Sequence, residues 1–229
     1  MLPLLTICPS RSRPEKCLRM VESFLETSSN SELEICLDYD DPLIDEYDKI
    51  PRNFRIHTLV QNRKNITQIY NQRWRISQHN YEYFSQTNDD FVYRTKDWDL
   101  KLMNYGINFG NDLFQGNNYP STSVIHSDII KAVGWLQLPD LTHLCGDLVW
   151  NIIGINCGCL NYCEDVIIEH ITPYNQKCDP DDIFKNTNSV EMYRRDQTAY
   201  IKWLMTSAVD DVKKVKEMLC QKYQSSQVR

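Results

Sequence analysis

At residues 81–93 the chain reads YEYFSQTNDDFVY, a short aromatic strand pattern that stops at an acidic turn. Aromatic and polar residues roughly alternate in its first half, as in a strand with one covered face. Asn88, Asp89 and Asp90 follow, and adjacent carboxylates do not favour a strand interior. Such a pair is tolerable when water solvates it in a turn, or when a hard cation such as Mg²⁺ or Mn²⁺ binds it.

The chain before this segment alternates strand and helix patterns. Alternation of this kind predicts right-handed crossovers and a parallel sheet. A second expected strand also ends in acids, at the segment DYDDP of residues 38–42. In open α/β sheets ligands bind beyond the carboxyl ends of the strands, so two acidic strand ends indicate a nucleotide–metal cleft. The expected strands are 2–8, 33–37, 53–59 and 81–86, and the expected helices are 14–25 and 66–78.

The second half of the sequence is less regular. A polar segment at 173–188, rich in Asp and Asn, is expected to be a mobile loop. The tail at 224–229 is expected to be disordered. The remaining expected helices are 98–107, 127–135, 145–154 and one or two within 190–223, and the remaining expected strands are 121–126, 157–162 and 166–169.

The composition bounds the class of protein. The chain has 229 residues, of which 41% are hydrophobic and 24% charged, which fits one large domain. A net charge of -6 argues against a nucleic-acid-coating surface. We expect no membrane span, since no apolar run is long enough, and no signal peptide. The nine scattered cysteines suit free thiols in a reducing compartment, so a cytoplasmic location is expected.

Five segments, in order, resemble those of GT-A glycosyltransferases, specifically the compact family-2-like type found in phages, large DNA viruses and bacteria. The resemblance extends from residue 4 to about residue 203. In this chain Ser12 and Asp97 stand where the family usually has Gly, and Asn88 stands where it has the first Asp of its DxD motif. The five segments are PSRSRP at 9–14, DYDDP at 38–42, NDD at 88–90 with TKDWD at 95–99, GW at 134–135 with LCGD at 144–147, and EHITP at 169–173.

The resemblance implies a fold and an activity. The fold would be an α/β GT-A domain over residues 1–188, with a mostly parallel sheet flanked by helices, and a C-terminal helical extension at 189–223. The activity would be metal-dependent transfer of a sugar from a nucleoside-diphosphate donor, with a UDP-sugar favoured, to a hydroxyl of a glycan or glycoconjugate. The cofactor would be Mn²⁺ or Mg²⁺, and the transfer would invert the anomeric carbon. The location would be the cytoplasm, or the host cytoplasm for a viral protein.

The resemblance also implies roles for the acidic and imidazole side chains. Asp90 would coordinate the metal, which would stabilise the departing nucleoside diphosphate, and His170 would complete the metal site. Asn88 would hydrogen-bond a ribose hydroxyl, since its amide oxygen is an acceptor. Asp147 would be the general base that takes the proton of the acceptor hydroxyl. The simpler alternatives are a turn for Asn88 and Asp89, a structural role for His170, and a helix-dipole contact for Asp147.

The donor-binding set is larger and less defined. Asp38 or Asp40 would accept a hydrogen bond from the base, unless these acids only cap the next helix. Asn71 would contact the ribose or hold a loop. Lys177 would pair with the diphosphate when the polar loop closes. The full expected set is Pro9, Ser10, Arg11, Arg13, Asp38, Asp40, Arg63, Asn71, Asn88, Asp89, Gly134, Trp135 and Lys177.

Three other readings of the sequence compete. A metal-dependent nucleotidyltransferase would carry a Gly-rich phosphate loop, which the loop at 9–14 is not. A catalytically silent nucleotide-sugar or carbohydrate-binding module would tolerate Asn88 and Asp97. A zinc module would use the cysteines at 157–163 with His170, but their C-x-C-x₃-C spacing lacks the usual second half-site.

Overall fold

The computed structural model describes residues 3–51 and 53–227, with side chains up to Gln224. Its strands are β1 (Leu4–Ser10), β2 (Ser31–Asp38), β3 (Ile56–Gln61), β4 (Tyr83–Gln86), β5 (Phe91–Tyr93), β6 (Ile107–Asn111), β7 (Ser123–His126) and β8 (Leu160–His170). Its α-helices are α1 (Pro14–Thr27), α2 (Ile66–Ser77), α3 (Trp98–Leu102), α4 (Ser127–Val133), α5 (Gly146–Cys157), α6 (Asp182–Thr187), α7 (Val190–Thr206) and α8 (Ala208–Gln227), with 3₁₀ turns η1 (Ile44–Lys49) and η2 (Pro173–Asn175).

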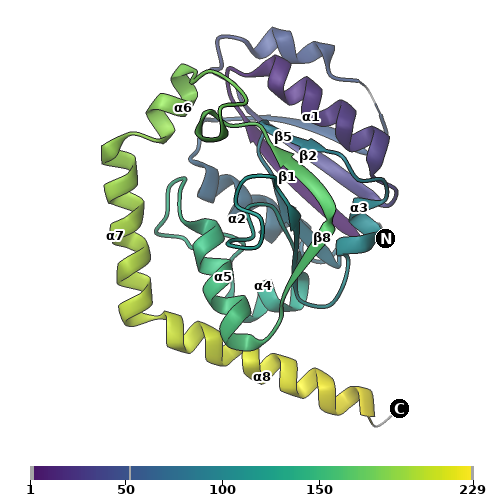
Figure 1. Ribbon diagram of the computed structural model, residues 1–229, viewed down its shortest axis with the longest axis vertical. Coiled ribbons are helices and arrows are strands. Elements are labelled where there is room, and N and C mark those ends of the chain that lie inside the picture. Colours follow the sequence, from purple (N-terminus) through teal and green to yellow (C-terminus); the bar gives the residue numbers. More distant parts are fainter. Residues whose placement is uncertain (1–2, 52, 228–229) are drawn as a thin grey trace.

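The strands form one sheet in the order β3-β2-β1-β4-β7-β6-β8-β5. Figure 1 shows this sheet with helices around it. β3, β2, β1 and β4 run parallel to one another, and β8 is parallel to β6. β7 is antiparallel to both β4 and β6, and β5 is antiparallel to β8. The predicted α/β fold, with a mostly parallel sheet flanked by helices, is therefore confirmed.

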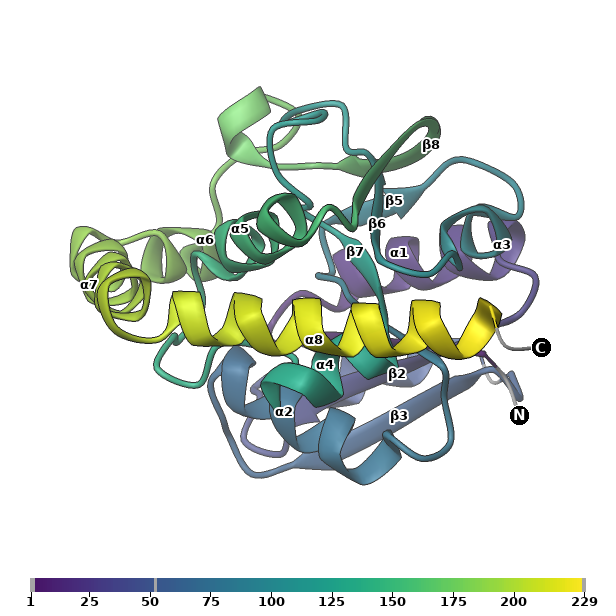
Figure 2. The same ribbon diagram turned by 90° about the horizontal axis from the view of Figure 1, so that it is seen from below.

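Both faces of the sheet carry a hydrophobic core, because neighbouring residues of β1 point to opposite faces. Leu5 and Ile7 pack with α2, α4, α5 and α8 on one face. Leu4 and Cys8 pack with α1 and α3 on the other. Burying one Leu or Ile side chain contributes about 1.5–3 kcal/mol, so this double burial explains the continuous apolar run of β1. Figure 2 shows α8 lying along α4 and α5.

Local sequence explains the main helix starts and two unusual backbone positions. Pro14 occupies the first turn of α1, and Asn65 with Gln68 forms a capping box that begins α2. Ser12 and Asp97 have φ of 55° and 56°, in the left-handed region that favours glycine. These are the two positions at which the resembling family usually has Gly, so the backbone bends there in spite of the side chain.

The second half differs from the sequence expectation in three elements. The expected helix 98–107 ends at Leu102, and the chain then enters β6. Gly106 has a φ of 141°, and a Cβ there would lie 2.7 Å from the carbonyl oxygen of Cys159, so only glycine permits this approach to β8. The strands expected at 157–162 and 166–169 are one strand, β8. β5 was not expected, since three residues give too short a pattern.

The C-terminal third is more ordered than expected. The polar segment 173–188 contains η2 and α6. α7 and α8 share the core of the sheet through Trp203 and Val215, so the expected extension is integral to the domain. A disordered tail was expected from residue 224, but α8 continues to Gln227. The last two residues of that tail, 228 and 229, lie outside the described residues, as does Leu2 at the start of the first expected strand. Within the described ranges, no helix is both long and apolar enough to cross a bilayer.

Candidate functional site

A cleft of about 1040 Å³ opens at the carboxyl ends of β1, β2 and β4. That volume is at the upper end of the range for small-molecule sites, which leaves room for two ligands side by side. It lies where the parallel strand order meets the antiparallel β7, the usual place for a ligand in an open α/β sheet. The expected site residues that line it are Pro9, Ser10, Arg11, Arg13, Asp38, Arg63, Asn88, Asp89, Asp90, Asp147 and His170.

The two adjacent carboxylates after β4 have different surroundings. Asp89 accepts hydrogen bonds from Ser10 Oγ at 2.7 Å and from Arg13 Nη1 at 3.1 Å. Asp90 has a buried Oδ1 with no hydrogen-bond partner among the described residues. That oxygen faces His170 Nε2 at 3.6 Å, and the ring of His170 stacks on Phe91 with centroids 4.4 Å apart. Asp89 is therefore satisfied by protein groups, and Asp90 is not.

The electrostatics separate the same two side chains. Burial, with Asp90 beside it, raises the pKa of Asp89. Burial also opposes ionisation of Asp90, but His170, Arg13 and Lys16 outweigh it and hold the pKa of Asp90 below its ordinary value. In a pair of interacting carboxyls the proton therefore goes first to Asp89. Asp90 keeps the negative charge that a cation would require.

These groups fit a divalent cation only in combination with a ligand. The described residues hold no cluster of three or more His, Cys, Asp or Glu side chains placed to bind a metal. Mg²⁺ and Mn²⁺ sites in nucleotide enzymes commonly use one or two protein groups and complete their coordination with water and phosphate oxygens. The unpartnered oxygen of Asp90 and the facing imidazole of His170 match that arrangement.

The acids after β2 divide between the cleft and the turn. Asp38 is buried and lines the cleft, where its Oδ2 accepts from Arg11 Nη1 at 3.1 Å. Asp40 is exposed, pairs with the same Arg11 Nη1 at 2.7 Å and is not among the lining residues described. Asp41 accepts from Ser12 N at 2.6 Å and from Leu43 N at 2.9 Å. Asp41 thus holds the turn, and Asp38 is the acid that faces the cleft.

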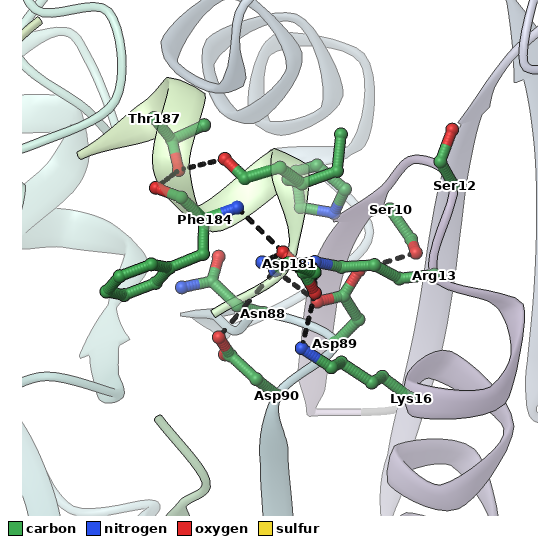
Figure 3. Close-up of polar contacts among 12 residues, drawn as sticks. Ser10, Ser12, Arg13, Lys16, Asn88, Asp89, Asp90, Asp181, Phe184 and Thr187 are labelled. Carbon is green, nitrogen blue, oxygen red and sulfur yellow. Dashed lines mark hydrogen bonds and ion pairs between the residues drawn. The ribbon is translucent and has the colours of Figure 1, made fainter. Parts of the chain in front are cut away.

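Arg13 connects the acidic pair to the C-terminal part of the chain (Figure 3). Its Nη1 contacts Asp89, as described, and lies 3.7 Å from Asp90 Oδ2. Its Nε and Nη2 donate to both carboxylate oxygens of Asp181, at 3.0 and 2.7 Å. Lys16 Nζ also contacts Asp181, at 2.6 Å, and Asp181 caps α6 by accepting from Phe184 N. α6 is therefore fastened over the cleft by two cations.

Asp147 begins α5 at the far side of the cleft. The bend that presents it needs Cys145 at a φ of 68° and then Gly146, where a Cβ would lie 2.2 Å from Gln137 Nε2. The carboxylate is half-buried, and burial raises its pKa. A raised pKa suits a group that accepts a proton near neutral pH. The only hydrogen bond found for it in the described part of the chain comes from Leu148 N at 2.9 Å.

A residue that the sequence did not indicate fixes the segment before Asp147. The carboxylate of Asp196, in α7, is 0% exposed and accepts from the backbone N–H groups of Thr142, His143 and Leu144 at 2.9, 2.7 and 2.6 Å. Three charge-assisted hydrogen bonds to one carboxylate hold this segment firmly. In the sequence Asp196 resembles an ordinary solvated helix residue, so no local pattern could have identified it.

Other expected donor contacts have structural roles instead. Asn71 donates to Gln137 O at 2.7 Å and accepts from Leu136 N and Gln137 N, so it holds a loop, one of its two expected roles. Gly134 ends α4 in a left-handed conformation. Trp135 is buried against Trp150, because its apolar area is more stable in the core than in a polar cleft.

Lys177 is the remaining expected donor contact, and it also lies away from the cleft lining. Its Nζ donates to Glu169 Oε1 at 2.6 Å. Glu169 precedes His170 on β8, and alternate residues of a strand point to opposite faces, so Lys177 is directed to the other face. In this arrangement Lys177 pairs with Glu169 and does not line the cleft in which a diphosphate was expected.

Comparison with known proteins gives a match at the level of structure alone. No protein-family model matches the sequence, and no curated protein does. The fold is similar to that of mannosyltransferase PcManGT from Pyrobaculum calidifontis, solved in complex with GDP-Man and Mn²⁺, with a TM-score of 0.57 and 10% identity over 96% of this chain and 75% of that one. It is also similar to S. aureus TarS, with a TM-score of 0.51 and 10% identity over 84% of this chain. This chain spans 43% of the TarS chain. The predicted GT-A type of fold is thereby confirmed.

Proposed function

We propose that this chain is a glycosyltransferase that moves a sugar from a nucleoside-diphosphate donor to an acceptor hydroxyl with the help of a divalent metal. The observation that carries the proposal is the buried oxygen of Asp90, which has no hydrogen-bond partner among the described residues and faces His170 at the carboxyl end of the sheet. In a GT-A type of fold, this is where a metal would join the donor phosphates to the protein. Asp90 and His170 would hold that metal.

The donor would lie along the N-terminal side of the cleft. Asp38 would accept from a ring N–H of the base, and Arg11, already paired with Asp38, would fix the orientation of that carboxylate. Arg13 and Lys16 would contact the diphosphate. Uracil and guanine both present a ring N–H to a carboxylate, so the GDP-Man complex of the structural neighbour makes a GDP-sugar the alternative to the favoured UDP-sugar.

The transfer would proceed in one displacement. Asp147 would take the proton of the acceptor hydroxyl as its oxygen forms a bond to the anomeric carbon. The bond from that carbon to the diphosphate oxygen would break, and its electron pair would leave with the nucleoside diphosphate. The metal supplies Lewis-acid stabilisation of that leaving group. Attack opposite to the leaving group inverts the anomeric centre. Asp147 is in α5 and Asp90 is in the turn between β4 and β5, so the two carboxylates come from different parts of the chain, as this geometry requires.

A nucleotide-sugar panel with and without Mn²⁺ tests the proposal. Ligands that bind only the folded state raise Tm, so a UDP-sugar should raise Tm only when Mn²⁺ is present. Asp90→Asn should abolish this metal-dependent shift, whereas Asp182→Asn, at an exposed carboxylate nearby, should not. Calorimetry showing that Asp90→Asn binds UDP with Mn²⁺ as tightly as the unmodified chain would exclude the metal assignment.

A further inference from the structure

The lining of the cleft divides into two chemically different walls. Four cations, Arg11, Arg13, Arg63 and Lys64, line it among residues before 92. From residue 114 onward the described lining contains no Lys or Arg. We call the first set the basic wall. The aromatic side chains of the second set form what we call the aromatic wall, which consists of Phe114, Tyr119, Tyr174, Phe184 and Tyr193.

The aromatic wall exposes flat apolar surface to the cleft. Phe114 is 38% exposed, Tyr174 59% and Tyr193 55%, although the cleft is concave. The rings of Phe114 and Tyr174 lie in parallel planes, within 1°, with centroids 6.5 Å apart. Phe184 places its ring edge-on to Tyr174 at 5.0 Å. Large aromatic side chains left open in a cleft indicate a surface that a ligand covers.

The two parallel rings are fixed by their own supports. The buried carboxylate of Asp112 accepts from the backbone N–H groups of residues 114–116, at 3.0, 2.7 and 3.0 Å, and from Ser121 Oγ at 2.7 Å. Tyr174 sits in η2, which a Thr172–Asn175 capping box closes, and its hydroxyl donates to Asn188 at 3.2 Å. Rings held in this way need little ordering when a ligand binds.

We infer that the aromatic wall is the acceptor subsite and that it takes a neutral saccharide unit, stacked on Phe114 and Tyr174. This inference rests on the proposed function and names the acceptor class. A pyranose ring presents a face of C–H groups, which the electron-rich face of an aromatic ring attracts, while its hydroxyls point outward. Hydroxyls at the rim would meet amide groups in the lining, those of Gln115, Asn186 and Asn188.

The charge of the wall restricts the saccharide further. A phosphorylated or carboxylated sugar unit would have to bury its charge here without a Lys or Arg among the described lining residues from 114 onward, which is unfavourable. Lys and Arg are available on the basic wall, where a diphosphate would bind. The division of charge therefore assigns the anionic donor to the basic wall and the neutral acceptor to the aromatic wall.

The position of the wall suits transfer. The ring of Phe114 lies 6.3 Å from that of His170, so a sugar stacked on Phe114 is next to the proposed metal site. Asp147 and His170 line the same cleft as Phe114. A hydroxyl of the stacked sugar would thus reach the region between the proposed base and the metal site.

Saturation-transfer NMR with a panel of neutral methyl pyranosides, in the gluco, galacto and manno configurations, tests the inference on the full chain. At least one glycoside should receive saturation on its ring C–H protons, while glucose 6-phosphate and uridine should not compete for the same site. Phe114→Ala and Tyr174→Ala should each weaken binding about 2- to 10-fold, the usual contribution of one aromatic contact. Tyr174→Phe should retain binding, because it keeps the ring.

Phe54→Ala is the matched control, since Phe54 is 81% exposed and lies outside the cleft. Circular dichroism establishes that each variant is folded. The inference is overturned if no glycoside binds, if removing either ring has no more effect than Phe54→Ala, or if uridine or glucose 6-phosphate occupies the wall. UDP binding with Mn²⁺ is measured on the same samples. A chain that binds UDP but no glycoside refutes only the acceptor subsite, and one that binds glycoside but no nucleotide refutes only the donor assignment.

Discussion

The two walls of the cleft are held in place by different kinds of contact. On the basic wall, cationic side chains pair with carboxylate side chains, as Arg13 does with Asp181 and Arg11 with Asp38. On the aromatic wall, the buried carboxylates of Asp112 and Asp196 accept backbone N–H groups instead. The basic wall is thus held by side chains that can change partner. In the aromatic wall, Phe114 and Tyr193 are next to backbone contacts of this kind, whereas Phe184 lies in α6, which Asp181 connects to Arg13 and Lys16.

This difference has an energetic consequence. An ion pair that water reaches contributes about 0–1 kcal/mol, so a phosphate can replace its carboxylate at little cost. Leaving a buried N–H group without an acceptor costs about 1–3 kcal/mol, and Asp196 satisfies three of them. We therefore expect the basic wall to rearrange when the donor binds, together with α6 and its Phe184, and the rest of the aromatic wall to keep its shape.

The largest expected effect concerns the chemistry of transfer, for which Asp147 is the proposed base. Asp147→Asn keeps the shape of the side chain and removes its basicity, so the transfer rate should fall about 10²- to 10⁴-fold while donor affinity changes little. Because burial raises the pKa of Asp147 and a base must be ionised, the acid limb of kcat/KM should lie above the ordinary Asp value of about 4. Transfer assays and calorimetry check this, and the product should have the inverted anomeric configuration. Near-normal turnover, or retained configuration, would refute the role of Asp147.

The next effect tests the rigidity of the aromatic wall. Asp196→Ala leaves three N–H groups without their acceptor, so the free energy of unfolding should fall by roughly 3 kcal/mol or more. Gln197→Ala, at an exposed position of the same helix, is the control and should change it by less than about 0.5 kcal/mol. Urea unfolding measures both. Equal values for the two variants would mean that the backbone contacts do not fix this wall.

The smallest effect tests whether the basic wall exchanges partners. Arg13 and Lys16, opposing the effect of burial, hold the pKa of Asp181 below its ordinary value, so Asp181 is ionised at neutral pH and competes with phosphate for both cations. Asp181→Asn should raise UDP affinity about 2- to 5-fold and accelerate tryptic cleavage at Lys177 and Lys185 beside α6. Asp182→Asn is the matched control. Weaker UDP binding by Asp181→Asn would show that Asp181 assists the donor rather than competing with it.

Much of the first half of the molecule could be predicted from the sequence. Apolar runs such as that of β1, alternating with helix patterns, depend only on which faces are buried, and this is a local property of the chain. The acids at the ends of β2 and β4 could also be placed together, because parallel strands of one sheet, here on either side of β1, end at the same edge.

What the sequence by itself determined is therefore the succession of β1 to β4 along the chain, their parallel arrangement and the acidic edge that faces the cleft. Only the tertiary structure decided which partner each polar side chain has. Arg13 and Asp181 are 168 residues apart, and Asp196 serves backbone groups more than 50 residues before it. Likewise, only the tertiary structure shows that Trp135 packs in the core and that Asn71 holds a loop. The physical reason is that periodicity reports burial of neighbouring residues, whereas a hydrogen bond depends on a meeting of distant segments that no local pattern encodes.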